Sequence, residues 1–151
     1  EPMPQLDAAW QVIHIVGRAR SSQSSEKATE IFQHYHPVKF FTEEMKYAYA
    51  AADVVLARAG FGTLTELAAL SKASIILPMV GTHQEENARH FAGEGGIILL
   101  DQAGSGLKLA QIIKDLINSP EKRREYGDRL HALLPQARPE RVIEIVSELV
   151  K

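Results

Sequence analysis

The sequence of 151 residues contains no cysteine, a single tryptophan and no long apolar run. Without cysteine the chain has no disulfide framework, no cysteine-ligated zinc site and no thiol nucleophile, which is compatible with a reducing compartment. No stretch approaches the roughly 18 apolar residues that cross a bilayer. The chain starts at Glu1 without an initiating Met, and its first residues lack the basic and apolar regions of a signal peptide. We therefore expect a fragment or a processed form.

The sequence also lacks a strong excess of charge of either sign. It has 17 Lys and Arg against 19 Asp and Glu, for a formal net charge of −2. This balance argues against a bulk nucleic-acid binder, which carries clustered Lys and Arg. Apolar residues make up 45% and charged residues 24% of the chain, as in ordinary globular proteins. A typical domain has roughly 100–200 residues, so we expect one domain over residues 1–151.

Short apolar runs alternate with amphipathic segments along the chain. The apolar runs predict β-strands at residues 12–17, 38–41, 53–58, 74–78 and 97–100. The amphipathic segments predict helices at residues 25–35, 45–52, 64–70, 84–92, 107–118, 120–134 and 139–150. This alternation predicts an α/β fold with a Rossmann-like parallel sheet and helices on both faces. Ligands of such sheets bind beyond the carboxyl ends of the strands.

Local chemistry predicts two boundaries near residue 40. Pro37 is expected to end the helix at 25–35, because proline removes a backbone donor. Thr42 is expected to be the N-cap of the helix at 45–52, since its hydroxyl can accept from the first free N–H groups. Glu43 and Glu44 would then lie in the first turn, where carboxylates meet the positive end of the helix.

The sharpest motif is the glycine-rich turn after the run at 53–58. Arg58 ends that run, Gly60, Phe61 and Gly62 form the turn, and a helix follows. Backbone N–H groups at a helix start bind anions, and the helix dipole assists. The turn therefore predicts a phosphate or diphosphate site at Gly62, Thr63, Leu64 and Thr65. Glu66 lies one turn inside the helix, where its carboxylate can accept from ribose hydroxyls.

A purely structural interpretation fits the same turn. Thr63 and Glu66 have the spacing of a capping box, in which each side chain satisfies a backbone donor of the other. The pattern alone favours this interpretation, although it does not exclude the phosphate site. The turn does not match the dinucleotide fingerprint, because Thr65 occupies its third glycine position.

A second polar cluster lies at residues 82–87. His83, Gln84 and Asn87 could hydrogen-bond a polyol such as a sugar. The pattern alone favours a solvated first helical turn instead. His83, Glu86 and His90 share one helix face, but no metal motif is present, and chance surface histidines explain them better. No GxSxG motif supports serine-hydrolase chemistry.

Several segments together resemble one family in order and spacing. They are residues 41–45, 50–55, 58–60, 63–69, 75–78 and 83–88. They resemble the motifs of the MurG family of GT-B glycosyltransferases, which transfer GlcNAc from UDP-GlcNAc to a lipid-linked acceptor, undecaprenyl-diphospho-MurNAc-pentapeptide, in peptidoglycan synthesis. The resemblance covers nearly the whole chain but only the carboxyl-terminal half of such an enzyme. It implies the UDP-sugar-binding half of a GT-B fold.

The resemblance also implies roles for individual residues. Arg58 would end the strand beneath the site, residues 61–65 would wrap the diphosphate with backbone N–H groups, and Gly60 would be a further substrate-binding residue. Glu66 would bind the ribose, while the main chain at Thr42 would read the uracil. Val16 and Gly17 would lie near the uridine. The family often has a residue with a hydroxyl group at the position of Val16, and valine cannot make that hydrogen bond. His83 and Gln84 would face the GlcNAc hydroxyls. No cofactor and no metal are expected, because no ligand set is visible and the helix-start donors would take the metal's place.

Departures from the family pattern limit what this chain is expected to do. Residues 71–73 replace a glycine-containing turn that ends in proline. The first strand with its Gly-rich loop is missing, as is the acceptor half with its membrane-associating surface and general base. We expect weak donor binding and no transfer by this chain alone, and the intact enzyme at the cytoplasmic face of the bacterial membrane.

Two other functions stay open on the sequence. The chain could be a donor subunit or non-catalytic module that needs a separate acceptor subunit. It could also belong to another sugar-nucleotide enzyme, such as a glycolipid transferase or an epimerase.

Overall fold

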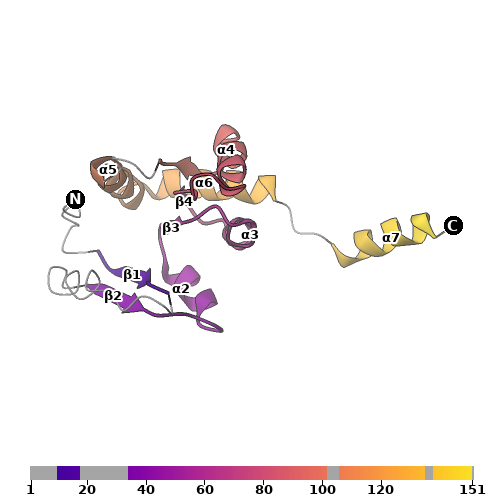
Figure 1. Cartoon of the computed structure of the whole chain (residues 1–151), viewed down its shortest axis with the longest axis horizontal. Coiled ribbons are helices and arrows are strands. Elements are labelled where there is room, and N and C mark those ends of the chain that lie inside the picture. Colours follow the sequence, from indigo (N-terminus) through magenta and orange to yellow (C-terminus); the bar gives the residue numbers. More distant parts are fainter. Residues whose placement is uncertain (1–9, 18–33, 102–105, 135–137, 151) are drawn as a thin grey trace.

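A computed structural model describes residues 10–17, 34–101, 106–134 and 138–150 of the chain. Its strands are β1 (Val12–Ile15), β2 (Tyr35–Val38), β3 (Val55–Ala57), β4 (Ser74–Ile76) and β5 (Ile98–Leu99). Its helices are α2 (Met45–Ala51), α3 (Phe61–Ala69), α4 (Gln84–Gly93), α5 (Gly106–Ile117), α6 (Pro120–Leu133) and α7 (Pro139–Leu149) (Figure 1). Most of the helix predicted at 25–35 lies outside the described residues.

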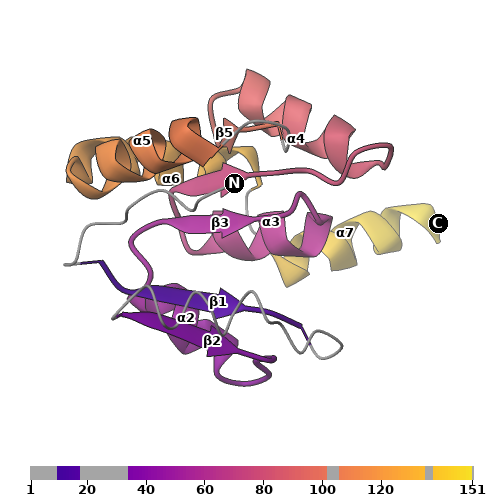
Figure 2. The same cartoon turned by 60° about the vertical axis from the view of Figure 1, so that its left-hand side comes forward.

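The sheet is parallel, as predicted, but it is divided. β1 pairs with β2, and β3, β4 and β5 form a second ladder in that order. Every pairing is parallel. Figure 2 shows β2, β1, β3 and β4 following one another across the view, with their arrows in one direction. The fold is thus α/β, with parallel sheets flanked by helices.

The predictions around β2 are wrong in detail. The strand predicted at 38–41 instead covers Tyr35–Val38, and Pro37 lies inside it, opposite His14. The carbonyls of His34 and Val38 accept from β1. Alternation along the strand therefore turns the nitrogen of Pro37 away from β1, towards the outer edge. Proline is tolerated there because no ladder hydrogen bond is lost.

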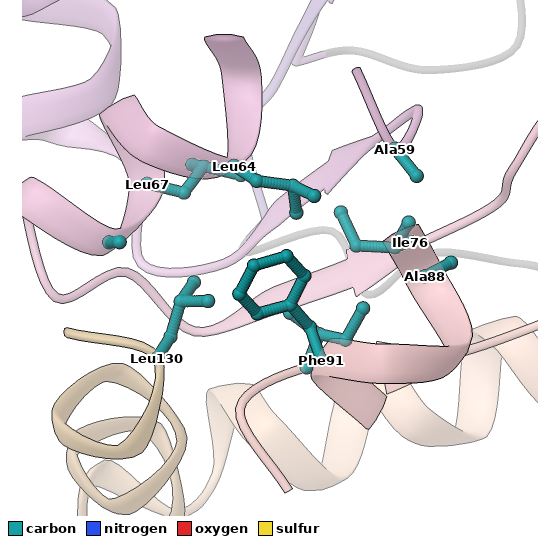
Figure 3. Packing of buried hydrophobic residues seen from close by; sticks show 9 residues of the cluster. Ala59, Leu64, Leu67, Ile76, Ala88, Phe91 and Leu130 are labelled. Carbon is teal, nitrogen blue, oxygen red and sulfur yellow. The ribbon is translucent and has the colours of Figure 1, made fainter. Parts of the chain in front are cut away.

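Apolar side chains cover both faces of the central strand β4. Ile75 and Ile76 point to opposite faces, and both are fully buried. Ile76 belongs to a cluster with Leu64 and Leu67 of α3, Phe91 of α4 and Leu130 of α6, among others (Figure 3). Ile75 belongs to a second cluster with Leu100 and Leu116. This burial explains why the runs at 74–78 and 97–100 are apolar without alternation.

Helix α3 is held firmly at its carboxyl end. His131 of α6 uses Nδ1 to donate to the carbonyl of Ala68, over 2.8 Å. Gly127 of α6 lies so close to Ser71 that a side chain at this position would overlap the Ser71 carbonyl oxygen. These contacts and the buried Leu64 and Leu67 fix the axis of α3, and thereby the place of its amino end.

Candidate functional site

The amino end of α3 has no side-chain cap. The helix begins at Phe61, and Gly60 is the N-cap in an extended conformation. The first helical hydrogen bond runs from the Leu64 N–H to the Gly60 carbonyl, over 3.0 Å. The N–H groups of Phe61, Gly62 and Thr63 therefore have no partner within the helix. They form a positively polarised start to α3 immediately after β3.

The capping-box prediction is wrong because α3 starts earlier than expected. Thr63 lies inside the first turn rather than at the N-cap, which is Gly60. The free donors also differ from those predicted, since the Leu64 N–H is used by the helix. By the same geometry the Thr65 N–H points to the carbonyl of Phe61. The Leu64 side chain is fully buried in the hydrophobic core and so fixes the turn against it.

Glu66 is exposed and lies one turn beyond these donors. Its Oε2 accepts a hydrogen bond from the hydroxyl of Tyr49 on α2, over 3.1 Å. Burial, together with the hydrogen bond and charge of Glu66, raises the pKa of Tyr49 to about 12. Within the described part of the chain, Oε1 of Glu66 has no hydrogen-bond partner. Tyr49 thus orients the carboxylate and leaves one oxygen to accept from a ligand.

Tyr49 did not emerge from the sequence as part of the site. It lies 17 positions before Glu66, on a different helix. In the sequence it is one of two tyrosines, Tyr47 and Tyr49, in the segment Met45–Ala51. This position does not indicate which carboxylate the hydroxyl will contact.

Arg58 connects the carboxyl ends of two strands. Its Nη1 donates to the carbonyl of Leu77 over 3.0 Å and to that of Pro78 over 3.2 Å. These carbonyls follow β4, whereas Arg58 follows β3. The guanidinium therefore links the loop after β3 to the loop after β4, and its place beneath a ligand site stays a prediction.

Side chains of α4 support the backbone around the glycine turn. Asn87 uses Nδ2 to donate to the carbonyl of Ala59, over 3.2 Å. Oε1 of Gln84 accepts from the N–H of Met79 over 3.2 Å, and the Thr82 hydroxyl donates to the Met79 carbonyl over 2.8 Å. Gln84 and Asn87, predicted as polyol ligands, thus have structural hydrogen bonds. His83 is exposed just before α4, and its contact with a sugar stays a prediction.

Thr42 contacts Glu44 instead of capping a helix. The N–H and the hydroxyl of Thr42 both donate to Oε2 of Glu44, each over 3.2 Å. Glu44 is the N-cap residue of α2, so the N-cap prediction for Thr42 is wrong. The cause is local, because the carboxylate folds back over the preceding turn and takes the donors of Thr42. A ligand that accepts a hydrogen bond from the Thr42 N–H would compete with Glu44 for that donor.

Val16 and Gly17 follow β1. The Val16 N–H donates to the Val38 carbonyl over 2.9 Å, so its backbone continues the ladder. Gly17 has φ of +85°, a left-handed conformation that favours glycine. The strands are parallel. Val16 and Gly17 therefore lie after the carboxyl end of a strand, as do the starts of α3 and α4. How Val16 and Gly17 contact a nucleotide stays a prediction.

The described residues offer neither a metal-binding cluster nor a helix that could span a membrane. Among the described residues, no group of three or more His, Cys, Asp or Glu side chains could hold a metal ion. This geometry gives no support to the grouping of His83, Glu86 and His90. In the same part of the chain, no helix combines the length and hydropathy needed to cross a bilayer.

Comparisons with known proteins point to one family. Residues 2–137 match the model of the glycosyltransferase family 28 C-terminal domain. The chain is 33% identical over 146 residues to a UDP-N-acetylglucosamine--N-acetylmuramyl-(pentapeptide) pyrophosphoryl-undecaprenol N-acetylglucosamine transferase of Anaeromyxobacter dehalogenans, covering 93% of this chain and 38% of that protein. It is 32% identical over 151 residues to the protein of the same name in Thermodesulfovibrio yellowstonii, covering 93% and 39%.

A solved structure supports the same fold. The chain is similar to MurG of Acinetobacter baumannii, with a TM-score of 0.71 and 23% identity, over 91% of this chain and 40% of that one. The chain therefore spans about two fifths of the proteins that it matches. Because the family model covers most of its residues, the chain belongs to the glycosyltransferase family 28 C-terminal domains, and among them to the MurG type.

Proposed function

We propose that this chain is the donor-binding half of an enzyme that transfers GlcNAc from UDP-GlcNAc to a lipid-linked acceptor in peptidoglycan synthesis. The observation that carries the proposal is the uncapped start of α3. Three backbone N–H groups at Phe61, Gly62 and Thr63 are available there for diphosphate oxygens. Glu66 lies one turn away with one oxygen available for ribose hydroxyls. The names of the curated relatives supply the sugar and the acceptor.

The same donors have a role in the transfer step. In the proposed inverting reaction, the acceptor oxygen attacks the anomeric carbon as the bond to the diphosphate breaks and UDP leaves. Negative charge grows on the leaving diphosphate, and preorganised N–H groups stabilise that charge more in the transition state than in the ground state. Arg58 keeps the neighbouring loops in place through its bonds to Leu77 and Pro78.

The acceptor side of the reaction requires more polypeptide than this chain contains. The chain spans about two fifths of its curated relatives, and its described residues offer no acceptor site or general base that we can assign. We therefore propose that this chain alone does not catalyse transfer. In the intact enzyme, we place the domain at the cytoplasmic face of the bacterial membrane, with membrane contact through the rest of the protein.

The role of Glu66 is tested by nucleotide binding. We expect Glu66→Gln to weaken UDP binding about tenfold or more, because hydrogen bonds to a charged group contribute about 1.5–3 kcal/mol. Isothermal titration calorimetry of UDP against this chain measures the change. Glu94→Gln, which alters an exposed glutamate at the far end of α4, is the matched control. Equal UDP affinity in the wild type and Glu66→Gln would reject the ribose role.

The identity of the sugar is tested separately. We expect UDP-GlcNAc to raise the thermal unfolding midpoint more than UDP-glucose or UDP-galactose at the same concentration, since stabilisation grows with ligand concentration relative to its dissociation constant. Differential scanning fluorimetry of the chain with each nucleotide sugar measures this. Equal shifts for all three would contradict the GlcNAc assignment and leave the UDP site intact.

A further inference from the structure

Helix α2 has little hydrophobic burial to hold it in place. It has seven residues, Met45–Ala51, and none of them is buried. Helices this short are marginal by themselves, so tertiary contacts must supply most of their stability. The position of α2 matters for the candidate site, because Tyr49 on this helix donates to Oε2 of Glu66 over 3.1 Å.

Lys72 makes the contact at the carboxyl end of α2. Its Nζ donates to the carbonyl of Ala52 over 2.9 Å and to that of Ala50 over 3.3 Å. The last carbonyls of a helix have no partner within the helix, and they form the negative end of its dipole. No basic residue lies in the last turn of α2 itself. Lys72 therefore provides the cation that this helix end lacks.

The backbone of Lys72 is fixed by the elements on either side of it. Its N–H donates to the carbonyl of Leu67 on α3 over 3.0 Å, and its carbonyl accepts from the hydroxyl of Ser74 over 2.8 Å. Ser74 is the first residue of β4 and is buried. The ammonium group thus extends from a point held by α3 and β4 to the end of α2. Lys72 belongs to residues 71–73, where the sequence departs from the family pattern.

Tyr49 carries this constraint to Glu66. Its ring packs against the core cluster that contains Leu64 and Leu67, and its hydroxyl donates to the carboxylate. Burial, and then the hydrogen bond and charge of Glu66, raise the pKa of Tyr49 to about 12, so the hydroxyl keeps its proton at neutral pH. An exposed glutamate otherwise loses rotamer freedom when it binds a ligand, and that loss weakens binding.

We propose that Lys72 and Tyr49 are positioning residues for nucleotide binding. Lys72 fixes the carboxyl end of α2, and the Tyr49 hydroxyl on that helix holds Glu66 in the orientation that accepts from the ribose. Both residues act without touching the nucleotide. The proposal rests on the ribose role of Glu66 in the proposed function. It adds two residues outside the glycine turn on which the affinity for the ribose hydroxyls depends.

Two nucleotides separate this positioning role from a general loss of the site. UDP has both ribose hydroxyls, whereas 2′,3′-dideoxyuridine diphosphate has neither. We expect Tyr49→Phe, which keeps the packed ring, to weaken UDP binding about fivefold and to leave binding of the dideoxy nucleotide unchanged. Titration of the chain followed by NMR measures both affinities, weak ones included. Tyr47→Phe is the matched control, since Tyr47 lies on the same helix and is 67% exposed.

The same pair of nucleotides tests Lys72. We expect Lys72→Met, which keeps the length of the side chain but cannot donate, to weaken UDP binding about threefold and not to affect the dideoxy nucleotide. Lys46→Met is the charge-matched control, because Lys46 on α2 pairs with the exposed Glu43. Since Lys72 acts through Tyr49, the double variant should bind UDP no more weakly than Tyr49→Phe alone.

Three outcomes would overturn the proposal. Unchanged UDP affinity in Tyr49→Phe and Lys72→Met shows that neither residue positions Glu66. Equal losses for UDP and the dideoxy nucleotide show a structural role in the whole site. Additive losses in the double variant show that Lys72 does not act through Tyr49. Failure of the proposed ribose role is distinct, because the wild-type chain itself would then bind UDP no more tightly than the dideoxy nucleotide, and the positioning proposal would fall with it.

Discussion

The carboxylate of Glu44 is bound directly by backbone and side-chain donors of its own turn. Hydrogen bonds from its own backbone N–H, and then from the N–H and hydroxyl of Thr42, lower the pKa of the Glu44 carboxyl below its ordinary value of 4.5. A lowered folded-state pKa means that the contribution to stability is present above the unfolded pKa. It is lost as the pH falls through the folded pKa. The turn before α2 should therefore loosen only at acid pH.

Thr42 provides a way to measure this effect. We expect Thr42→Val, which removes the hydroxyl donor and keeps the backbone N–H, to raise the pKa of Glu44 partway towards 4.5. NMR titration of the side-chain carboxyl measures the change. Thr65→Val is the matched control, because that hydroxyl donates to Gly62 and not to Glu44. An unchanged Glu44 titration in Thr42→Val would contradict the hydrogen-bond assignment.

Ser71 shows how one residue accommodates a departure from the family pattern. It has φ of +48°, and no other non-glycine residue in the described ranges has a positive φ. The Ser71 N–H donates to Ala68 and the Lys72 N–H to Leu67, which ends α3 in a tight turn. A serine thus adopts a conformation that glycine adopts more readily. This turn lies at the carboxyl end of α3, at the opposite end of the helix from the glycine turn.

Among whole elements, the packing of α6 on α3 decides where the candidate site lies. Leu130 is fully buried against Leu64 and Leu67, and His131 bonds to the last turn of α3. The closest approach is at Gly127, where α6 passes the Ser71 backbone. Because α3 begins at the glycine turn, a shift of α6 would move the free N–H groups relative to β3.

A substitution at this closest approach should be costly. We expect Gly127→Ala to lower the free energy of unfolding by about 3 kcal/mol, because the added methyl group meets rigid backbone. Urea denaturation followed by circular dichroism measures the difference. Gly93→Ala in α4 is the matched control, since an added Cβ there meets no atom within 4 Å. Equal loss of stability in both variants would contradict this packing argument.

At the scale of the whole molecule, α7 stands apart from the other elements. Every residue of Pro139–Leu149 is exposed, including Ile143 at 65% and Leu149 at 81%. Figure 1 shows the helix extending away from the sheets at the carboxyl end. The helix is amphipathic, and its apolar residues add no burial to either core cluster.

Removing α7 should therefore leave the core intact. We expect deletion of residues 138–151 to change the thermal unfolding midpoint by less than about 2 °C, because every described residue in that range, 138–150, is exposed. It should also reduce self-association, since exposed apolar patches promote it. Thermal unfolding and light scattering measure the two effects. A large fall in the midpoint would show that α7 packs against the core in solution.

Local sequence patterns were enough to predict the parallel α/β fold, the order of most elements and the glycine turn. Apolar runs, amphipathic spacing and glycine act over a few neighbouring residues, so they can be interpreted without distant partners. The three-dimensional packing was needed to show that α3 begins at Phe61, that Asn87 bonds to Ala59 and that Tyr49 orients Glu66. It also showed that the described strands form two ladders, β1-β2 and β3-β4-β5. These outcomes depend on groups that are distant in sequence and meet only when helices and strands pack together.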